Sequence, residues 1–387
     1  MKIPGLQLPG IVQPIAHRIR SLFKAQSPGS LATIGVTLAV ALLFMGVSLL
    51  GSGEESYSST VIRISGSPGS QSTQSAAPSQ AVSLIAANGE VISDPDLIEM
   101  SADGPLPKIS RDGRLPMSVY ARKLDKSDPR PKIVLIVTGM GLSASLTQTA
   151  IDTLPPGISL AFTPYGSSLQ GMASAARAIG HEVLLEVPLE PYDYPNNDPG
   201  QNTLLAEAPV KDNVARLNWV LSRFTGFAGL INSQGSKYLA SPKDTQSLMD
   251  QARMRGLYLF DNGVSDQSLT RETARATGTA FARATRVVDA MPSQEAIEKE
   301  LAALEREAQE RGLAVAVASA YPVTIERLKV WALGLEQKGL SLAPASAAVV
   351  SEKVPALPKP VRATTPTHSK PEAAVHANDH SEPGPHP

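Results

Sequence analysis

The feature that most constrains the fold is an alternation of short apolar segments with amphipathic segments between Lys132 and Val350. The apolar segments have the length of buried strands, and the segments between them have the periodicity of helices, as in Ser293–Arg311. The predicted strands are Ile133–Val137, Ile158–Phe162, Glu182–Val187, Phe227–Ile231, Leu257–Phe260, Thr279–Ala282, Ala314–Ala318 and Leu340–Ala343. This alternation indicates an α/β fold with a parallel sheet, either a deformed (β/α) barrel or a doubly wound open sheet.

The charge balance and the absence of cysteine exclude several classes of function. Lysine and arginine number 35 and aspartate and glutamate number 36, so no strong field attracts nucleic acid. A chain without cysteine has no disulfide, no thiolate metal site and no cysteine nucleophile. This composition is typical of a compartment in which free thiols would be oxidised.

The segment Leu31–Gly51 carries no charge and is long enough to cross a hydrocarbon core of about 30 Å as a helix. Before it, basic residues occur without any acid: Lys2, Arg18, Arg20 and Lys24. Glu54 and Glu55 follow it. The positive-inside rule therefore predicts a single-pass protein of the inner (cytoplasmic) membrane, with residues 1–30 in the cytoplasm and the domain periplasmic or extracytoplasmic. A cleaved signal peptide is the alternative.

The remaining segments divide the chain around one large domain at 101–350. Residues 52–100 are rich in serine, glycine and proline and are expected to form a flexible linker. Between Asp94 and Lys132, prolines alternate with apolar residues, which indicates an extended strap docked on the domain. The tail at 351–387 is rich in proline and histidine without periodicity and is expected to be disordered.

The candidate site residues follow the predicted strands, because ligands bind at the carboxyl ends of strands in both alternative folds. The residues assigned to substrate binding are Thr138, Tyr165, Glu190, Tyr192, Asn232, Ser236 and Asp289. Glu186 and Asp261 are the candidate catalytic carboxylates, since a carboxylate can act as a general base toward water. His181 is the domain's one histidine; it precedes a strand, so we expect it to form a structural hydrogen bond.

Each of these assignments has a structural alternative. Glu186 and Glu190 can form an acid–base pair in a shared cleft, or Glu186 can form a salt bridge with Arg283 or Arg286. Asp261 and Asp289 can orient a substrate or cap the helices that follow. The rings of Tyr165 and Tyr192 can stack on sugars or pack under the long loop that follows the third strand.

Several sequence blocks, in order, carry a family resemblance: IVTGMG, LAFTPYG, GHEVLLEVPLEP, GLINSQGS, GLYLFDN and VASAYPVTIERL. Over about Ser101–Val350 the chain resembles the divergent polysaccharide deacetylase family. The resemblance implies a deformed (β/α) barrel of the polysaccharide deacetylase type, like that of metal-dependent esterases that remove acetyl groups from envelope sugars. It therefore also implies a carbohydrate-related role outside the cytoplasm.

The resemblance also implies metal-ligand positions, and this chain departs from the family at each of them. Thr138 and Gly139 stand where two aspartates are usual, and Glu186 stands where a histidine is usual. Ser233–Gln234 replaces a second histidine, and Ser319–Ala320 replaces a late Gly-His. Two carboxylates without imidazole make a poor zinc site and at best a weak calcium or magnesium site, so we expect no bound metal and no other cofactor.

Three hypotheses of function remain after this comparison. The first is a membrane-anchored pseudoenzyme that binds an envelope glycan or oligosaccharide. The second is an active carbohydrate deacetylase or other hydrolase that uses Glu186 or Asp261 without zinc. In the third, the domain is a structural partner of an envelope protein and the cleft has no ligand.

Overall fold

The structure, a computed structural model, describes residues 84–350 except 88 and 90. The predicted membrane segment at 31–51 and the predicted tail at 351–387 lie outside the described residues. Among the residues that are described, no helix is long and apolar enough to cross a membrane.

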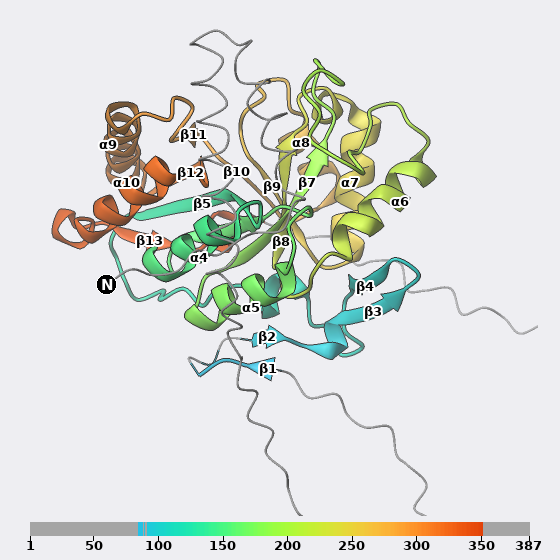
Figure 1. Cartoon of the computed structure of the whole chain (residues 1–387), viewed down its shortest axis with the longest axis horizontal. Coiled ribbons are helices and arrows are strands. Elements are labelled where there is room, and N and C mark those ends of the chain that lie inside the picture. Colours follow the sequence, from blue (N-terminus) through green and yellow to red (C-terminus); the bar gives the residue numbers. More distant parts are fainter. Residues whose placement is uncertain (1–83, 88, 90, 351–387) are drawn as a thin grey trace, which may run out of the picture. The chain divides into compact units, whose positions relative to one another are not determined.

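The core of the domain is a nine-stranded sheet in which all strand pairs are parallel. Its strands are β5 (Lys132–Met140), β6 (Ser159–Phe162), β7 (Val183–Leu189), β8 (Gly229–Gln234), β9 (Tyr258–Asp261), β10 (Phe281–Arg283), β11 (Arg286–Val287), β12 (Leu313–Ser319) and β13 (Ser341–Ala343). The order is β10-β9-β8-β7-β6-β5-β12-β11, and β13 pairs with β5 (Figure 1). All eight predicted strands are present with shifted ends, and β11 was not predicted.

One short segment joins the two ends of this strand order. Residues 281–287 pair with β9 through β10 and with β12 through β11. Between the two strands, the Ala284 N–H donates to the Asp261 carbonyl at 2.9 Å, and the Thr285 N–H donates to the Val315 carbonyl at 2.9 Å. The parallel sheet with its helices therefore fits a deformed (β/α) barrel, and the doubly wound alternative is wrong.

Seven helices of at least two turns follow strands of the sheet (Figure 1). They are α4 (Ala144–Thr153), α5 (Leu169–Ile179), α6 (Val210–Leu221), α7 (Pro242–Met254), α8 (Thr270–Thr277), α9 (Gln294–Arg311) and α10 (Pro322–Leu333). Serine side chains cap α4, α7 and α9 at Ser143, Ser241 and Ser293. Each capping oxygen accepts one of the N–H groups that have no partner in the first helical turn. The predicted helix Ser293–Arg311 is therefore confirmed, with Ser293 as its cap.

Alternate residues of β5 enter two different apolar clusters. Ile133, Leu135 and Val137 pack in the cluster that contains the helices, whereas Val134 and Ile136 pack in the other. That second cluster also contains residues of β7, β9 and β12, strands far apart in the order, so the sheet curls around it. Burial of both faces explains why the strands read as continuous apolar runs rather than as alternating patterns.

The segment that precedes the barrel forms secondary structure within the range where a flexible linker was expected. It comprises β1 (Leu84–Ile85), β2 (Val91–Ser93), β3 (Ile98–Ser101), β4 (Gly104–Pro107) and α3 (Pro116–Val119). Leu97 is buried, the Asp94 carboxylate pairs with Arg114, and the buried Arg177 donates to the Val91 carbonyl at 2.7 Å. The expected linker at 52–100 is thus wrong for residues 91–100, which bury an apolar side chain and are held by charge-assisted hydrogen bonds.

The amino-terminal end of the barrel is closed around the buried carboxylate of Glu182. This carboxylate accepts hydrogen bonds from the Arg122 N–H at 2.8 Å, the Tyr258 hydroxyl at 2.9 Å, and both the N–H and the hydroxyl of Ser346 at 2.7 and 2.6 Å. Burial raises the pKa of Glu182 above its usual value. The anchor fixes the chain after β13 across this end, which leaves the carboxyl end of the strands for a ligand.

Candidate functional site at the carboxyl ends of the strands

Glu186 is the carboxylate that the barrel places at the centre of the candidate site. It belongs to β7, reaches past the end of β6 and accepts a hydrogen bond from the Gly139 N–H at the end of β5. Glu186 is 6% exposed, and burial raises the pKa of its carboxyl group to about 7. The hydrogen bond from the Gly139 N–H lowers this pKa but does not outweigh burial. A carboxyl group with such a pKa is close to half-ionised at neutral pH, so it can both accept and donate a hydrogen bond.

The arginines named as alternative partners of Glu186 bind elsewhere. Arg283 donates to the Ser265 carbonyl at 2.7 Å and lies 3.7 Å from the carboxylate of Asp261. Arg286 pairs with Glu300 at 2.8 Å. The alternative of a salt bridge between Glu186 and either arginine is therefore wrong.

Thr138 and Gly139 lie near the end of β5, where its pairing with β6 is irregular between Val137 and Met140. The Thr138 hydroxyl donates to the Ala318 carbonyl at 3.1 Å, and Thr138 lies in register with Ser319 on β12. Gly139 has a φ of 81°, a left-handed conformation that non-glycine residues rarely adopt. This end of β5 thus presents a backbone N–H and one hydroxyl where the family resemblance implies two carboxylates.

Tyr165 lies beneath the loop that follows β7. Its hydroxyl donates to the Gln201 carbonyl at 2.6 Å, and its ring is 6.1 Å from that of Trp219 between centroids. A Cβ atom on Gly200 would lie 2.6 Å from the Tyr165 ring. Burial raises the pKa of the Tyr165 hydroxyl above its usual range, and the charges of Asp198 and, more weakly, Glu186 act in the same direction. The ring packs under the loop, in line with the structural alternative.

Tyr192 is the exposed aromatic residue among those predicted. Tyr192 is 59% exposed, and its hydroxyl donates a hydrogen bond to Gln267 Oε1 at 2.8 Å. The Tyr192 N–H donates to the Ser236 hydroxyl at 3.2 Å. These bonds bring together the loops that follow β7, β8 and β9 and hold the ring at their surface.

Glu190 and Asn232 are already bound to neighbouring loops. One carboxylate oxygen of Glu190 lies 2.8 Å from Lys237 Nζ, and the other accepts from the Ala206 N–H at 2.6 Å. The Asn232 side-chain oxygen accepts from the Asn262 N–H at 2.8 Å, and its amide donates to the Gln234 carbonyl at 2.7 Å. Both side chains therefore fix the loops, and Glu190 contacts Lys237 instead of pairing with Glu186.

The two aspartates predicted at strand ends organise helix starts. Asp261 accepts from the hydroxyls of Ser268 at 2.8 Å and Thr270 at 2.6 Å, before and at the first residue of α8. Asp289 accepts from the Ser319 N–H at 2.7 Å and the Thr324 hydroxyl at 2.9 Å, beside the start of α10. Both carboxylates are buried. Their contacts favour the structural alternative over a role toward substrate.

The donor set at the barrel mouth does not fit a zinc ion. In the part of the chain that the structure describes, no three His, Cys, Asp or Glu side chains are grouped so as to hold a metal. His181 is buried and its ring nitrogens face the carbonyls of Ile158 at 2.8 Å and Ile151 at 3.4 Å, as expected for a structural histidine. Burial lowers its pKa, although these carbonyls act in the opposite direction. A hydrolytic zinc centre needs about three nitrogen or oxygen ligands around an open position.

Sequence reasoning did not assign a role to several apolar residues in the loops at the same end of the barrel. Leu142 follows β5, Met291 follows β11 and Tyr321 follows β12; they are 69%, 67% and 48% exposed. Val264, in the loop after β9, is 65% exposed. A single exposed apolar residue in a loop has no periodic sequence signal, so only the common location of these loops identifies them as a group.

The parallel sheet and its helices fit a (β/α) barrel of the deacetylase type. Residues 135–349, more than half of the chain, match the family described as divergent polysaccharide deacetylase. The chain belongs to this family, and the resemblance inferred from its sequence blocks is confirmed.

The chain is similar to three known proteins to different degrees. Uncharacterized protein ATU2773 from Agrobacterium tumefaciens C58 is 36% identical with a TM-score of 0.61, over 63% of this chain and 99% of that one. Uncharacterized protein YibQ of Escherichia coli (strain K12) is 21% identical over 199 residues, which are 51% of this chain and 61% of that protein's length. The catalytic domain of peptidoglycan N-acetylglucosamine deacetylase from Eubacterium rectale ATCC 33656 is 15% identical with a TM-score of 0.39, over 61% and 97%.

Proposed function

We propose that this protein is a membrane-anchored, extracytoplasmic member of the family that binds an envelope glycan and has lost the usual metal-dependent deacetylase site. The observation that carries the proposal is the contact between Glu186 and Gly139. At the positions where the family resemblance implies imidazole and two carboxylates, the chain places one carboxyl group against a glycine N–H. This set suits hydrogen bonding to a neutral ligand better than it suits zinc.

The barrel mouth carries groups that match the chemistry of a sugar. Glu186, with a pKa of about 7, can accept a hydrogen bond from one sugar hydroxyl or donate one to another. The exposed rings of Tyr192 and Tyr321 offer flat apolar faces of the kind on which sugar rings stack. Polar edges beside apolar faces are the usual composition of a small-molecule site.

The proposed location rests on the amino-terminal sequence. The uncharged segment Leu31–Gly51 follows four basic residues and precedes two glutamates, which favours a cytoplasmic start and an external domain. A serine-rich segment then allows the domain to reach a glycan at some distance from the bilayer.

The second candidate function, hydrolysis without zinc, is favoured by the pKa of Glu186. A general base works best when its pKa is near the working pH, and a value of about 7 meets this requirement. In that reaction the Glu186 carboxylate takes a proton from water, the water oxygen attacks the acetyl carbonyl, and the carbon–nitrogen bond breaks as the amine receives a proton.

One experiment separates these functions. The full-length chain is titrated with chitin oligosaccharides and peptidoglycan fragments while bound ligand and released acetate are measured together. Binding without acetate supports the glycan-binding proposal. Acetate release that Glu186→Gln abolishes supports the hydrolase. If neither is seen, both are overturned and the third hypothesis, a protein partner in the envelope, gains support.

A further inference from the structure

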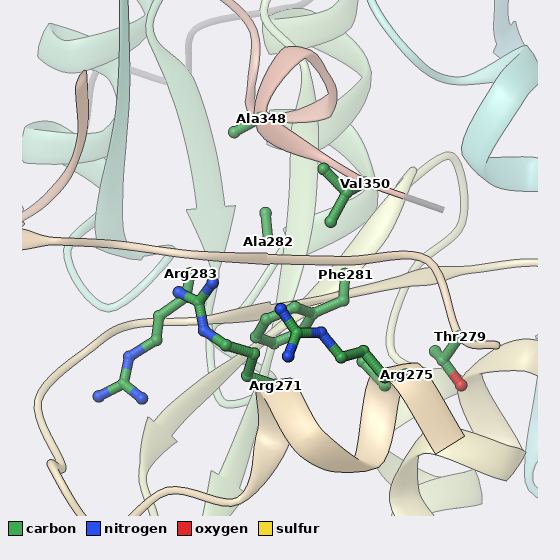
Figure 2. Close-up of a pocket in the computed structure, with 9 residues that line it drawn as sticks. Arg271, Arg275, Thr279, Phe281, Ala282, Arg283, Ala348 and Val350 are labelled. Atoms are coloured by element: carbon green, nitrogen blue, oxygen red, sulfur yellow. The ribbon is translucent and has the colours of Figure 1, made fainter. Parts of the chain in front are cut away.

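A basic pocket lies between α8 and the edge strand β10, and it shares no residue with the site around Glu186. Its volume is about 370 Å³. Arg271 and Arg275 line it from α8, and Phe281 and Arg283 line it from β10 (Figure 2). Val350 closes one side, where its backbone pairs with that of Phe281 through two hydrogen bonds of 2.9 and 3.0 Å.

The pocket concentrates positive charge. Three of its lining residues are arginines, and no carboxylate lines it. Arg271 and Arg275 are four residues apart on one helix face, a spacing at which like charges destabilise a helix. Arg271 also lies in the first turn of α8, where the helix dipole disfavours a cation. An anion beside Arg271 would offset the unfavourable effect of the helix dipole on this residue.

The three arginines are not held in the same way. Arg283 is oriented by the Ser265 carbonyl at 2.7 Å and by Asp261 at 3.7 Å. Arg271 makes no salt bridge with any carboxylate that the structure describes, and its residue is exposed. Figure 2 shows Arg271 and Arg275 extending from α8 towards the strand that carries Phe281. The head group of Arg271 is therefore available to a ligand that enters beside Phe281.

We propose that this pocket binds a small organic anion, with a carboxylate or phosphate group at the arginines and an apolar body against Phe281. A guanidinium presents parallel N–H groups that match two oxygens of a carboxylate or phosphate. Phe281 is buried and, together with Ala274 and Ala282, gives the pocket an apolar side. The combination selects an anion that carries hydrocarbon over an inorganic ion.

The test is a calorimetric titration of the full-length chain with phenyl phosphate and with benzoate. Benzyl alcohol is the neutral match, and inorganic phosphate is the match without an apolar body. We expect saturable binding of at least one organic anion, and the tighter of the two identifies the head group. Arg271→Gln should weaken that binding about tenfold through loss of one charge-assisted pair. Arg306→Gln, which removes an exposed arginine of α9, is the matched control and should bind normally.

Several results would overturn the proposal: no saturable binding, equal affinity for benzyl alcohol or for inorganic phosphate, or the same loss in both arginine variants. Glu352 follows Val350 by two residues in the sequence, so the titration is repeated with Glu352→Gln. Binding that is seen only in this variant would assign the pocket to the chain's own carboxylate instead. Because Arg271 is exposed and its charge is unfavourable at the start of α8, its replacement should not lower the melting temperature, which separates lost binding from lost folding.

Discussion

The Gly139 N–H donates a hydrogen bond to the Glu186 carboxylate and so connects the ends of β5 and β7. These two residues occupy positions where the family resemblance implies an aspartate and a histidine. Among the described residues no ion pair joins Glu186 to a basic side chain, and Arg283 and Arg286 lie beside other acids. Burial outweighs this hydrogen bond, so the ionised form of Glu186 costs the protein stability.

This relationship predicts a pH-dependent stability. The pKa of Glu186 is raised from 4.5 to about 7 on folding. Because the folded state favours the protonated form of Glu186, the stability that this form contributes is fully present below about pH 4.5. It is lost as the pH rises through about 7. Replacing Glu186 by Gln removes this titration. Relative to wild type, Glu186→Gln should gain up to about 3 kcal/mol in free energy of unfolding between pH 5 and pH 8, measured by urea denaturation.

Glu190→Gln serves as the control for this measurement. The Glu190 carboxylate is paired with Lys237 and with the Ala206 N–H, so its replacement should lower stability at both pH values. An equal difference between Glu186→Gln and wild type at pH 5 and pH 8 would contradict the assignment of the raised pKa.

How much of the site the sequence could reveal depends on the kind of contact. Ser293 and the helix after it were predictable, since a cap and a 3.6-residue period are local signals. The partner of Glu186 was not, because it is a backbone N–H 47 positions away in the sequence, and a backbone donor has no sequence signature. The two-residue strand β11 is too short to show any periodicity.

The roles of Tyr165 and Tyr192 were also beyond sequence reasoning. Tyr165 closely follows one predicted strand and Tyr192 closely follows the next, so their sequence contexts are alike. What distinguishes them is that Gly200 lies against the Tyr165 ring while the Tyr192 ring stays exposed. Contacts formed when a long loop folds back decide this difference.

The two tyrosines are therefore expected to respond differently to mutation. Tyr192→Ala should weaken oligosaccharide binding by about 1 kcal/mol through lost stacking and leave the melting temperature nearly unchanged. Tyr165→Ala should lower stability by about 3 kcal/mol, because it removes a packed ring. Titration with chitin oligosaccharides and thermal denaturation of both variants provide the comparison. If Tyr192→Ala binds as wild type does, Tyr192 is not part of the glycan site.

The anchor at Glu182 predicts a large effect far from the candidate site. Glu182→Gln replaces one acceptor oxygen by an NH₂ group that faces buried donors, and we expect a loss of about 2–4 kcal/mol in free energy of unfolding. Ser346→Ala, which removes one of the donors to Glu182, should cost about 1 kcal/mol. Glu336→Gln alters an exposed carboxylate and should be neutral. A Glu182→Gln variant as stable as Glu336→Gln would refute the anchor.

The proposed topology is tested by a fusion. A reporter that is active only outside the cytoplasm is joined after Val350 and compared with the same reporter joined after Lys24. The basic residues before Leu31–Gly51 predict activity in the first fusion and none in the second. The reverse result would place the domain in the cytoplasm and remove the support for an envelope glycan as ligand.

The altered donor set predicts how the protein responds to zinc. The wild-type domain should hold no stoichiometric zinc by elemental analysis, and a chelator should leave its melting temperature unchanged because no metal-linked stability is lost. Zinc affinity should arise when ligands are restored by Thr138→Asp, Glu186→His and Ser233→His together. Gly139 is retained in this variant, because its φ of 81° would strain an aspartate by about 1–2 kcal/mol. One tightly held zinc per wild-type domain would show that other residues bind metal and would overturn the proposed loss of the deacetylase site.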